Sequence, residues 1–219
     1  MVKWKEERGL VLSTSMRLVE KGLVAGTAGN VSLRLMGKDS PDLIAITPTS
    51  RYYDTLTVDD IPVIDFNGAA VEGQLKPSSE MRLHIAIYKA RPDIRAVIHT
   101  HSTYASAASV AGLEIPVILE EEAIFLGGTV RTAKYARTGT SELAQNAVEA
   151  LEDRNAVLLA NHGMVGVGET IRQALDACEM VEIAAHVYFL ALTTGRANQL
   201  SAEVVKDLKN NFRKARKTQ

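Results

Sequence analysis

The sequence predicts a mixed α/β protein in which the strands pair mainly in an antiparallel manner. Four short strand-like segments come before the second predicted helix, and no long crossover helix separates them, as parallel pairing would require. Two of these segments, 61–65 and 69–72, flank Asn67-Gly68, a dipeptide that tolerates the positive φ angles of a type I′ hairpin turn. The 219 residues contain no repeat, low-complexity tract or linker, so we expect one domain over 1–219 with a basic helical tail from about 201.

The composition is that of an ordinary soluble protein, with 46% hydrophobic and 23% charged residues. The formal net charge of −1 provides no field that would attract nucleic acid or an anionic membrane, so we expect neither partner. Charges interrupt the N-terminal apolar positions, unlike a signal peptide, and no window approaches the ~18 apolar residues of a membrane span. The single cysteine, Cys178, excludes an intramolecular disulfide and suits a reducing compartment. We therefore expect a cytoplasmic protein.

The N-terminal third predicts one helix followed by two strands. Residues 4–21 form an amphipathic pattern that ends at Gly22. A glycine-rich segment at 26–30 then leads into Val31–Leu35, where apolar and polar residues alternate as in a half-buried strand. The glycine-rich segment is either a tight turn that needs positive φ or a nest of N–H groups for an anion. A second strand, 43–47, runs into a cluster of hydroxyl side chains after Pro48.

A helix is predicted to begin after Pro77, with Ser78 as its N-cap, and to end near Arg91. Glu80 would lie in its first turn, where a carboxylate is stabilising by about 0.3–1 kcal/mol even without a catalytic role. His84 follows one helical turn later and can pair with Glu80.

The second half predicts further alternation of strands and helices. We expect a strand at 94–101, a helix of small residues at 104–110, a short apolar strand at 115–119, a helix at 141–151, a buried strand at 156–160 and a long helix at 169–194. Three acids, Glu120, Glu121 and Glu122, follow the strand at 115–119. They form either a solvated face or a group in which one side chain points into a cleft.

Three histidines predict a divalent-metal site. Alternation along 94–101 places His99 and His101 on one side of a strand, and His162 follows the buried strand 156–160. Two imidazoles at this spacing can bind one metal ion, and three protein ligands leave the open position of a catalytic zinc site. The other interpretation of His99 and His101 is a polar strand end that faces solvent. Glu80 is either a fourth ligand or the acid/base, and the hydroxyl-rich turns are candidates for binding a phosphate through neutral donors.

Five motifs in this order, GTAGNVS, ITPTS, KPSSE, HTH and NHG, resemble the class II aldolase/adducin family, most closely its L-fuculose-1-phosphate aldolases. The resemblance extends from about residue 5 to about residue 195. It implies a three-layer α/β/α sandwich around a mostly antiparallel sheet, and a homotetramer with active sites between subunits. The implied reaction is the reversible, Zn²⁺-dependent cleavage of a ketose 1-phosphate, such as L-fuculose 1-phosphate, to dihydroxyacetone phosphate and an aldehyde.

The resemblance also implies a role for individual residues. It implies that His99, His101 and His162 bind zinc, and that Glu80 is the catalytic acid/base and also approaches the metal. It implies three pairs of phosphate-binding positions: Gly29 and Asn30, Thr49 and Ser50, and Ser78 and Ser79. Ser50 replaces the glycine that these aldolases usually have, so its contact would come from the backbone N–H.

Two departures affect the aldehyde end of the substrate. A tyrosine that these aldolases carry after the strand at 115–119 is replaced at about Glu120, and the C-terminal tail lacks the tyrosine that closes over their site. Glu120 or Glu121 is the candidate replacement acid/base, and the identity of the aldehyde stays open. The alternatives within the family are a sugar-phosphate 4-epimerase, a sugar-acid phosphate decarboxylase or a non-catalytic adducin-like module. The epimerases carry aspartate where Glu80 stands, and the three histidines argue against a module without metal chemistry.

Overall fold

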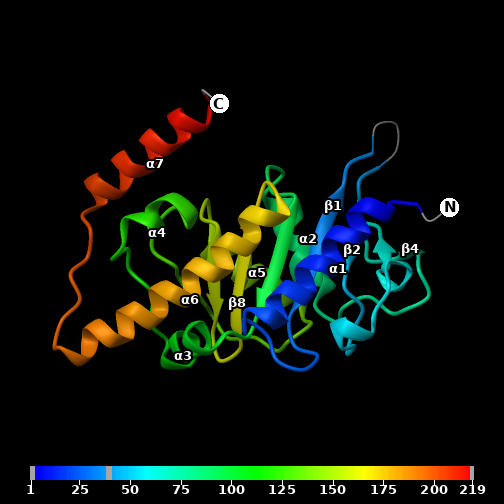
Figure 1. The fold of residues 1–219 in the computed structure, drawn as a ribbon, viewed down its shortest axis with the longest axis horizontal. Helices are drawn as coiled ribbons and strands as arrows, with labels where there is room; N and C mark the ends of the chain where they lie inside the picture. Colours follow the sequence, from blue (N-terminus) through cyan, green and yellow to red (C-terminus); the bar gives the residue numbers. More distant parts are fainter. Residues whose placement is uncertain (1–2, 38–40, 218–219) are drawn as a thin grey trace.

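The computed structural model of the chain describes residues 3–37 and 41–217, with side chains as far as residue 211. Eight strands of this described part form one sheet in the order β4-β3-β2-β1-β5-β8-β7-β6 (Figure 1). Neighbouring strands are antiparallel except for the edge pair β6 and β7. The predicted α/β class and mostly antiparallel sheet are therefore confirmed.

The strands are β1 (Asn30–Leu35), β2 (Leu43–Ile46), β3 (Val63–Ile64), β4 (Ala70–Glu72), β5 (Ala96–Thr100), β6 (Thr132–Ala133), β7 (Ala156–Leu159) and β8 (Gly163–Gly168). The α-helices are α1 (Lys5–Glu20), α2 (Met81–Ala90), α3 (Thr103–Ala111), α4 (Glu120–Phe125), α5 (Ser141–Leu151), α6 (Ile171–Thr193) and α7 (Ala202–Lys217). Two short 3₁₀ helices, η1 (Tyr53–Thr55) and η2 (Val58–Asp60), connect β2 to β3.

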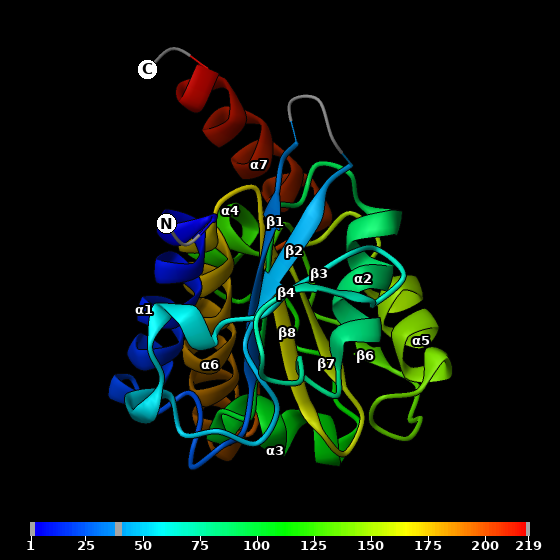
Figure 2. The same cartoon turned by 90° about the vertical axis from the view of Figure 1, so that its right-hand side faces the viewer.

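Helices cover both faces of the sheet and make the three layers that the family resemblance implies. Helices α1, α3 and α6 lie on one face and α2 and α5 on the other (Figure 2). Each of the two helix layers packs on the sheet through its own apolar cluster. One cluster contains Leu18, Ala105 and Val181, and the other contains Ile87 and Leu143. The central strands are therefore buried on both sides.

Burial on both faces corrects the expectation that β1 is half-buried. All six of its residues are buried, including Ser32 and Arg34, because helices pack over both sides of this central strand. The polar side chains find partners inside the protein: Arg34 donates from its two terminal nitrogens to the backbone carbonyls of Pro92 and Tyr88, and Ser32 bonds to His84. The alternation in sequence predicted the strand correctly, but the expectation that its polar side chains face solvent was wrong.

The hairpin between β3 and β4 forms as predicted, but with a different turn. Only Gly68 has a positive φ, of 85°, so the turn is not of type I′. The Asp65 carboxylate organises the loop instead, because its Oδ1 accepts from the N–H groups of Asn67 and Ala69 at 2.8 Å each. Asp65 was therefore the determining turn residue, through the side-chain bonding typical of aspartate.

The region between α3 and α6 differs most from prediction. Residues 115–119 are not a strand, because only Ile115 forms a bridge, to Val130. The sequence did not predict α4, β6 or β8. Strand β8 was missed because it is rich in glycine, which normally weakens strands. Here a Cβ at Gly166 would lie 2.6 Å from the Cys178 Sγ, so the close packing of α6 on β8 requires glycine.

The C-terminal tail forms the predicted helix, α7, which extends from the body of the protein (Figure 1). Lys209 on α7 lies 3.4 Å from the Asp153 carboxylate. None of the helices in the described ranges is both long and apolar enough to cross a membrane.

Candidate active site

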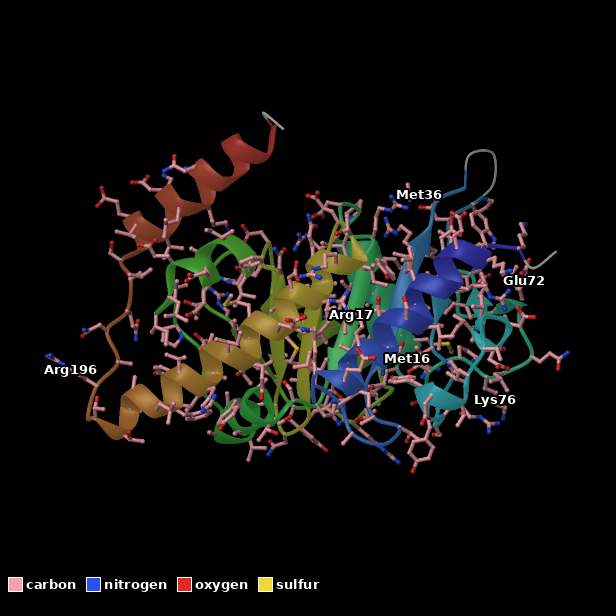
Figure 3. All side chains as sticks on the ribbon, viewed as in Figure 1. Met16, Arg17, Met36, Glu72, Lys76 and Arg196 are labelled. Carbon is pink, nitrogen blue, oxygen red and sulfur yellow. The ribbon has the colours of Figure 1, made fainter. Side chains whose placement is uncertain are left out.

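The predicted site residues gather at one end of the sheet. The register pairs Asn30, which begins β1, with His99 near the end of β5. A bridge between Pro48 and Pro77 places the segments 47–50 and 76–79 side by side. Lys76 marks this end in Figure 3, whereas Met36, which follows β1, marks the opposite end. Segments far apart in the sequence therefore converge where the motifs predicted a site.

The three histidines form one cluster. One ring nitrogen of each of His99, His101 and His162 lies within 4.8 Å of those of the other two. The Nε2 atoms of His99 and His101 are 2.8 Å apart. His99 Nδ1 lies 2.9 Å from the backbone carbonyl of Met164, which can only accept, so Nδ1 carries the proton and Nε2 presents its lone pair to the cluster.

The turn between β7 and β8 positions His162. Asn161 adopts a left-handed conformation with a φ of 55°, which asparagine tolerates better than most residues. Gly163 follows, where a Cβ would lie 2.3 Å from the Thr100 carbonyl oxygen and 3.0 Å from the His101 ring. The Asn-His-Gly motif therefore supplies both the backbone bend and the close contact with β5 that place the third imidazole.

The electrostatics of the cluster favour neutral imidazoles at His99 and His101. Burial lowers the pKa of His99 well below its usual value, and the neighbouring His162 and His101 lower it further. Burial also lowers the pKa of His101, with a further contribution from His162. Converging lone pairs on neutral imidazoles are the donor set that a divalent cation such as Zn²⁺ prefers, so these residues fit the predicted metal.

Glu80 joins the histidine cluster from the start of α2. It occupies the N-cap position rather than the first turn, and the predicted cap Ser78 instead accepts from the Glu80 N–H at 3.2 Å. Its Oε2 accepts from Asn30 Nδ2 at 2.9 Å and lies 3.2 Å from His99 Nε2. Its Oε1 lies 3.6 Å from His162 Nε2 and has no hydrogen-bond partner among the described residues. One carboxylate oxygen is thus oriented by an amide and the other is free.

The glycine-rich turn is a tight turn that approaches the backbone of His99 in the histidine cluster. Gly29 has a φ of +77°, and a Cβ there would lie 2.8 Å from the His99 carbonyl oxygen. Tyr53 donates from its hydroxyl to the Gly29 carbonyl at 2.7 Å. No local motif singles out Tyr53 in the sequence, because the role of Tyr53 depends on where η1 lies relative to the turn.

The segments with the predicted phosphate-binding residues lie side by side next to Glu80. The Thr49 N–H donates to the Lys76 carbonyl at 3.0 Å. Ser50 and Ser79 are exposed and Thr49 is partly buried, whereas Ser78 is buried. Ser50 has a φ of 53°, a conformation that favours glycine. The conformation is consistent with a position that suits glycine, and the phosphate contact of the Ser50 backbone N–H stays a prediction.

The match to a family model now decides the identity of the fold. Residues 10–189 match the class II aldolase and adducin N-terminal domain. The chain belongs to this family. It is 35% identical to 5-deoxy-D-ribulose 1-phosphate aldolase from Bacillus thuringiensis serovar kurstaki, over 95% of this chain and 96% of the relative. It is 39% identical to L-fuculose phosphate aldolase from Escherichia coli K12, over 83% and 82% of the two chains.

A solved structure of L-fuculose 1-phosphate aldolase superimposes with a TM-score of 0.91, at 37% identity over 97% of this chain and 98% of that chain. The motifs noted in the sequence are thus those of a class II aldolase. With its relatives, they establish the chain as an enzyme of the lyase class.

In this class II aldolase the three consecutive acids have separate environments. Glu122 is buried and accepts from the N–H groups of Ile118 and Leu119 at 3.1 and 2.9 Å, and burial raises its pKa to about 7. Glu120 and Glu121 are exposed at the start of α4. Both views show α4 away from the sheet end where α3 lies, and no hydrogen bond or ion pair within the described ranges joins Glu120 to the histidines (Figures 1 and 2). The buried acid therefore stabilises its own helix start, and the catalytic role of Glu120 stays a prediction.

Proposed function

We propose that this enzyme is a Zn²⁺-dependent aldolase that reversibly cleaves a ketose 1-phosphate to dihydroxyacetone phosphate and an aldehyde. The observation that carries the proposal is the Glu80 carboxylate, 3.2 Å from His99 and 3.6 Å from His162 in a three-histidine cluster. The names of both curated relatives support the substrate class, because fuculose 1-phosphate and 5-deoxyribulose 1-phosphate are both ketose 1-phosphates.

Retro-aldol cleavage requires a base at the aldehyde end, for which Glu120 is the candidate, to take the proton of the C4 hydroxyl. C4 then becomes the aldehyde carbonyl, the C3–C4 bond breaks, and its electron pair stays on C3 of the three-carbon fragment. His99, His101 and His162 would hold a divalent ion, which would supply Lewis-acid stabilisation of the negative charge that develops. Glu80 then delivers a proton to C3 and recovers it in the reverse direction. The Asn30 amide holds Oε2, so the unpartnered Oε1 is the oxygen that is free to exchange this proton.

The phosphate would bind where the two hydroxyl-rich segments meet the glycine-rich turn. We assign it to Gly29, Asn30, Thr49, Ser50, Ser78 and Ser79. Backbone N–H groups and hydroxyls provide neutral donors for such an anion. The Ser78 hydroxyl already accepts from the Glu80 N–H, so its assigned contact would also couple the phosphate end to the acid/base.

The aldehyde end is the part of the substrate that we leave to direct screening. Both named relatives act on sugars that end in a methyl group, so acetaldehyde and lactaldehyde are the first aldehydes to test. Glu120 is exposed within one chain, which suits a contribution to the site of a neighbouring subunit. The family resemblance implies a homotetramer, which we include in the proposal, and sedimentation velocity would test it. A chain that sediments as a monomer at assay concentration would refute the assembly.

The decisive test is hydrogen exchange at C3 of dihydroxyacetone phosphate in D₂O, followed by proton NMR without an aldehyde. The wild-type, metal-loaded enzyme should exchange this proton. Glu80→Gln should keep its metal, because three histidines remain, and lose exchange by about 10²–10⁴-fold, the usual contribution of a general acid/base. Glu142→Gln, a change at an exposed helix residue, is the matched control and should behave as wild type. Wild-type protein that binds metal but does not exchange would favour an epimerase or a decarboxylase.

A further inference from the structure

A line of buried hydrogen bonds leads from Glu80 into the core. Asn30 is the first residue after Glu80, and its Nδ2 donates to the Glu80 carboxylate at 2.9 Å. His84 is the next, and its Nε2 bonds to Asn30 Oδ1. His84 Nδ1 lies 2.6 Å from Ser32 Oγ, which is 2.8 Å from the Tyr88 hydroxyl. Asn30, Ser32, His84 and Tyr88 are each at most 4% exposed. His84 therefore does not pair directly with Glu80, as the sequence had suggested, but acts on it through Asn30.

The chemistry of the groups fixes the direction of these hydrogen bonds. An amide oxygen only accepts, so His84 Nε2 must carry the proton that it shares with Asn30 Oδ1. Burial lowers the pKa of His84 to about 3, which keeps the ring neutral at physiological pH. Its Nδ1 then accepts, and Ser32 is the donor.

This direction determines which way the Asn30 amide faces. An amide can rotate by half a turn with almost no change in shape, exchanging its oxygen and nitrogen. The reversed orientation would direct the amide oxygen at the Glu80 carboxylate and would place two N–H donors, one from each residue, between Asn30 and His84. The Glu80 carboxylate accepts from Nδ2 at one end of the amide, and a donor on His84 is needed at the other end to bind Oδ1 and hold this orientation.

We propose that His84 is a positioning residue for Glu80: it fixes the orientation of the Asn30 amide, which in turn holds Oε2 of the carboxylate and leaves Oε1 free. This inference rests on the proposed acid/base role of Glu80. Spacing supports it, because Glu80, His84 and Tyr88 recur every four residues along one face of α2. Ser32 reaches the same line from β1.

Two substitutions of similar character separate positioning from packing. In His84→Gln the longer amide can still donate to Asn30 Oδ1, whereas in His84→Asn the shorter amide keeps the Ser32 contact but cannot reach Asn30. We expect kcat for ketose 1-phosphate cleavage to fall about 10–100-fold in His84→Asn, as for other supporting hydrogen bonds around metal sites, and to recover largely in His84→Gln. Metal content and thermal midpoint should be similar in the two variants. Equal losses in both, or wild-type kcat in His84→Asn, would overturn the proposal.

A second measurement does not depend on activity. Nitrogen-15 NMR of the metal-free wild-type protein should show His84 as the neutral Nε2–H tautomer, and Ser32→Ala should disturb that signal without changing residue volume greatly. An Nδ1–H tautomer or a charged ring at neutral pH would overturn the proposal even if the variants fail to fold. If the wild type shows the predicted tautomer but no exchange into dihydroxyacetone phosphate, the proposed function fails while the hydrogen-bond direction stands.

Discussion

Gly163 links the strand order to the geometry of the histidine cluster, and its substitution gives the sharpest test of that link. It begins β8 immediately after His162, and β8 pairs with β5, which carries His99. A Cβ at this position would lie 2.3 Å from the backbone oxygen of Thr100. A backbone carbonyl within a central sheet cannot rotate away, so Gly163→Ala must push the two strands apart.

The geometry sets the size of the effect. Cβ atoms essentially never come closer than 3.0 Å to such a neighbour, so the strands must separate locally by at least about 0.7 Å. His162 moves with Gly163, so its ring nitrogen would move away from the ring nitrogens of His99 and His101. Overpacking should cost about 1–3 kcal/mol of stability, and a misplacement on the order of 1 Å should lower turnover about 100-fold.

The assay is a zinc titration of the metal-free variant, with turnover measured on the reloaded protein. Gly166→Ala is the matched control, because it overpacks the same strand against Ala174 and Cys178 on α6, away from the histidine rings. Both variants should lose stability, but only Gly163→Ala should lose metal affinity by tenfold or more. If Gly163→Ala binds zinc as tightly as Gly166→Ala and turns over equally fast, close strand contact is not what places His162.

Three further predictions address the surroundings of the site. Ser50→Gly should stabilise the protein by about 0.5–1 kcal/mol in thermal unfolding by relieving a positive φ, whereas Thr49→Gly should destabilise it; a loss in both would contradict the strain argument. Burial raises the pKa of Glu122 to about 7, above its unfolded value, so the stability it contributes is present below about pH 4.5 and is lost as the pH rises through 7. Glu122→Gln keeps the acceptor for both N–H bonds but does not titrate. Between about pH 4.5 and 7 its free energy of unfolding should therefore fall by about 1–2 kcal/mol less than that of the wild type. Equal falls in the two proteins would contradict this role of Glu122. Dialysis against a chelator should abolish exchange into dihydroxyacetone phosphate, and Zn²⁺ should restore it; activity that survives complete metal removal would contradict the metal-dependent mechanism.

The sequence was sufficient for those parts of the site that depend on local pattern. Strand alternation correctly predicted that His99 in β5 and His101 just after it come together, and the buried apolar segment correctly placed His162 in the turn after β7. The helix start after Pro77 located Glu80 to within two positions of its place in the structure, where Glu80 rather than Ser78 is the N-cap. Each of these predictions needed only the periodicity of a single helix or strand and a histidine or glutamate at a position that suits metal or acid/base chemistry.

The missing parts depend on contacts between elements. Ser32 looked like the solvent-facing position of a half-buried strand, and only the position of α2 over β1 makes it a donor to His84. Glycines in β8 obscured that strand, although they are what allows α6 and β5 to pack closely. The four-residue spacing of Glu80, His84 and Tyr88 was the one local signal that pointed inward, and it could not identify Asn30 as the residue in between.

The close approach of glycines to β5 explains why the histidine cluster can hold its geometry before a metal ion binds. β5 lies between β1 and β8, and a glycine approaches its backbone from each side: Gly29 near the His99 carbonyl and Gly163 near the Thr100 carbonyl. His99 is additionally fixed through Nδ1 by Met164. The ring therefore has little freedom to move, whereas His101, past the end of β5, is exposed. Because the buried His99 is rigid and the exposed His101 can adjust, a bound ion should alter the position of the His101 ring more than that of the His99 ring.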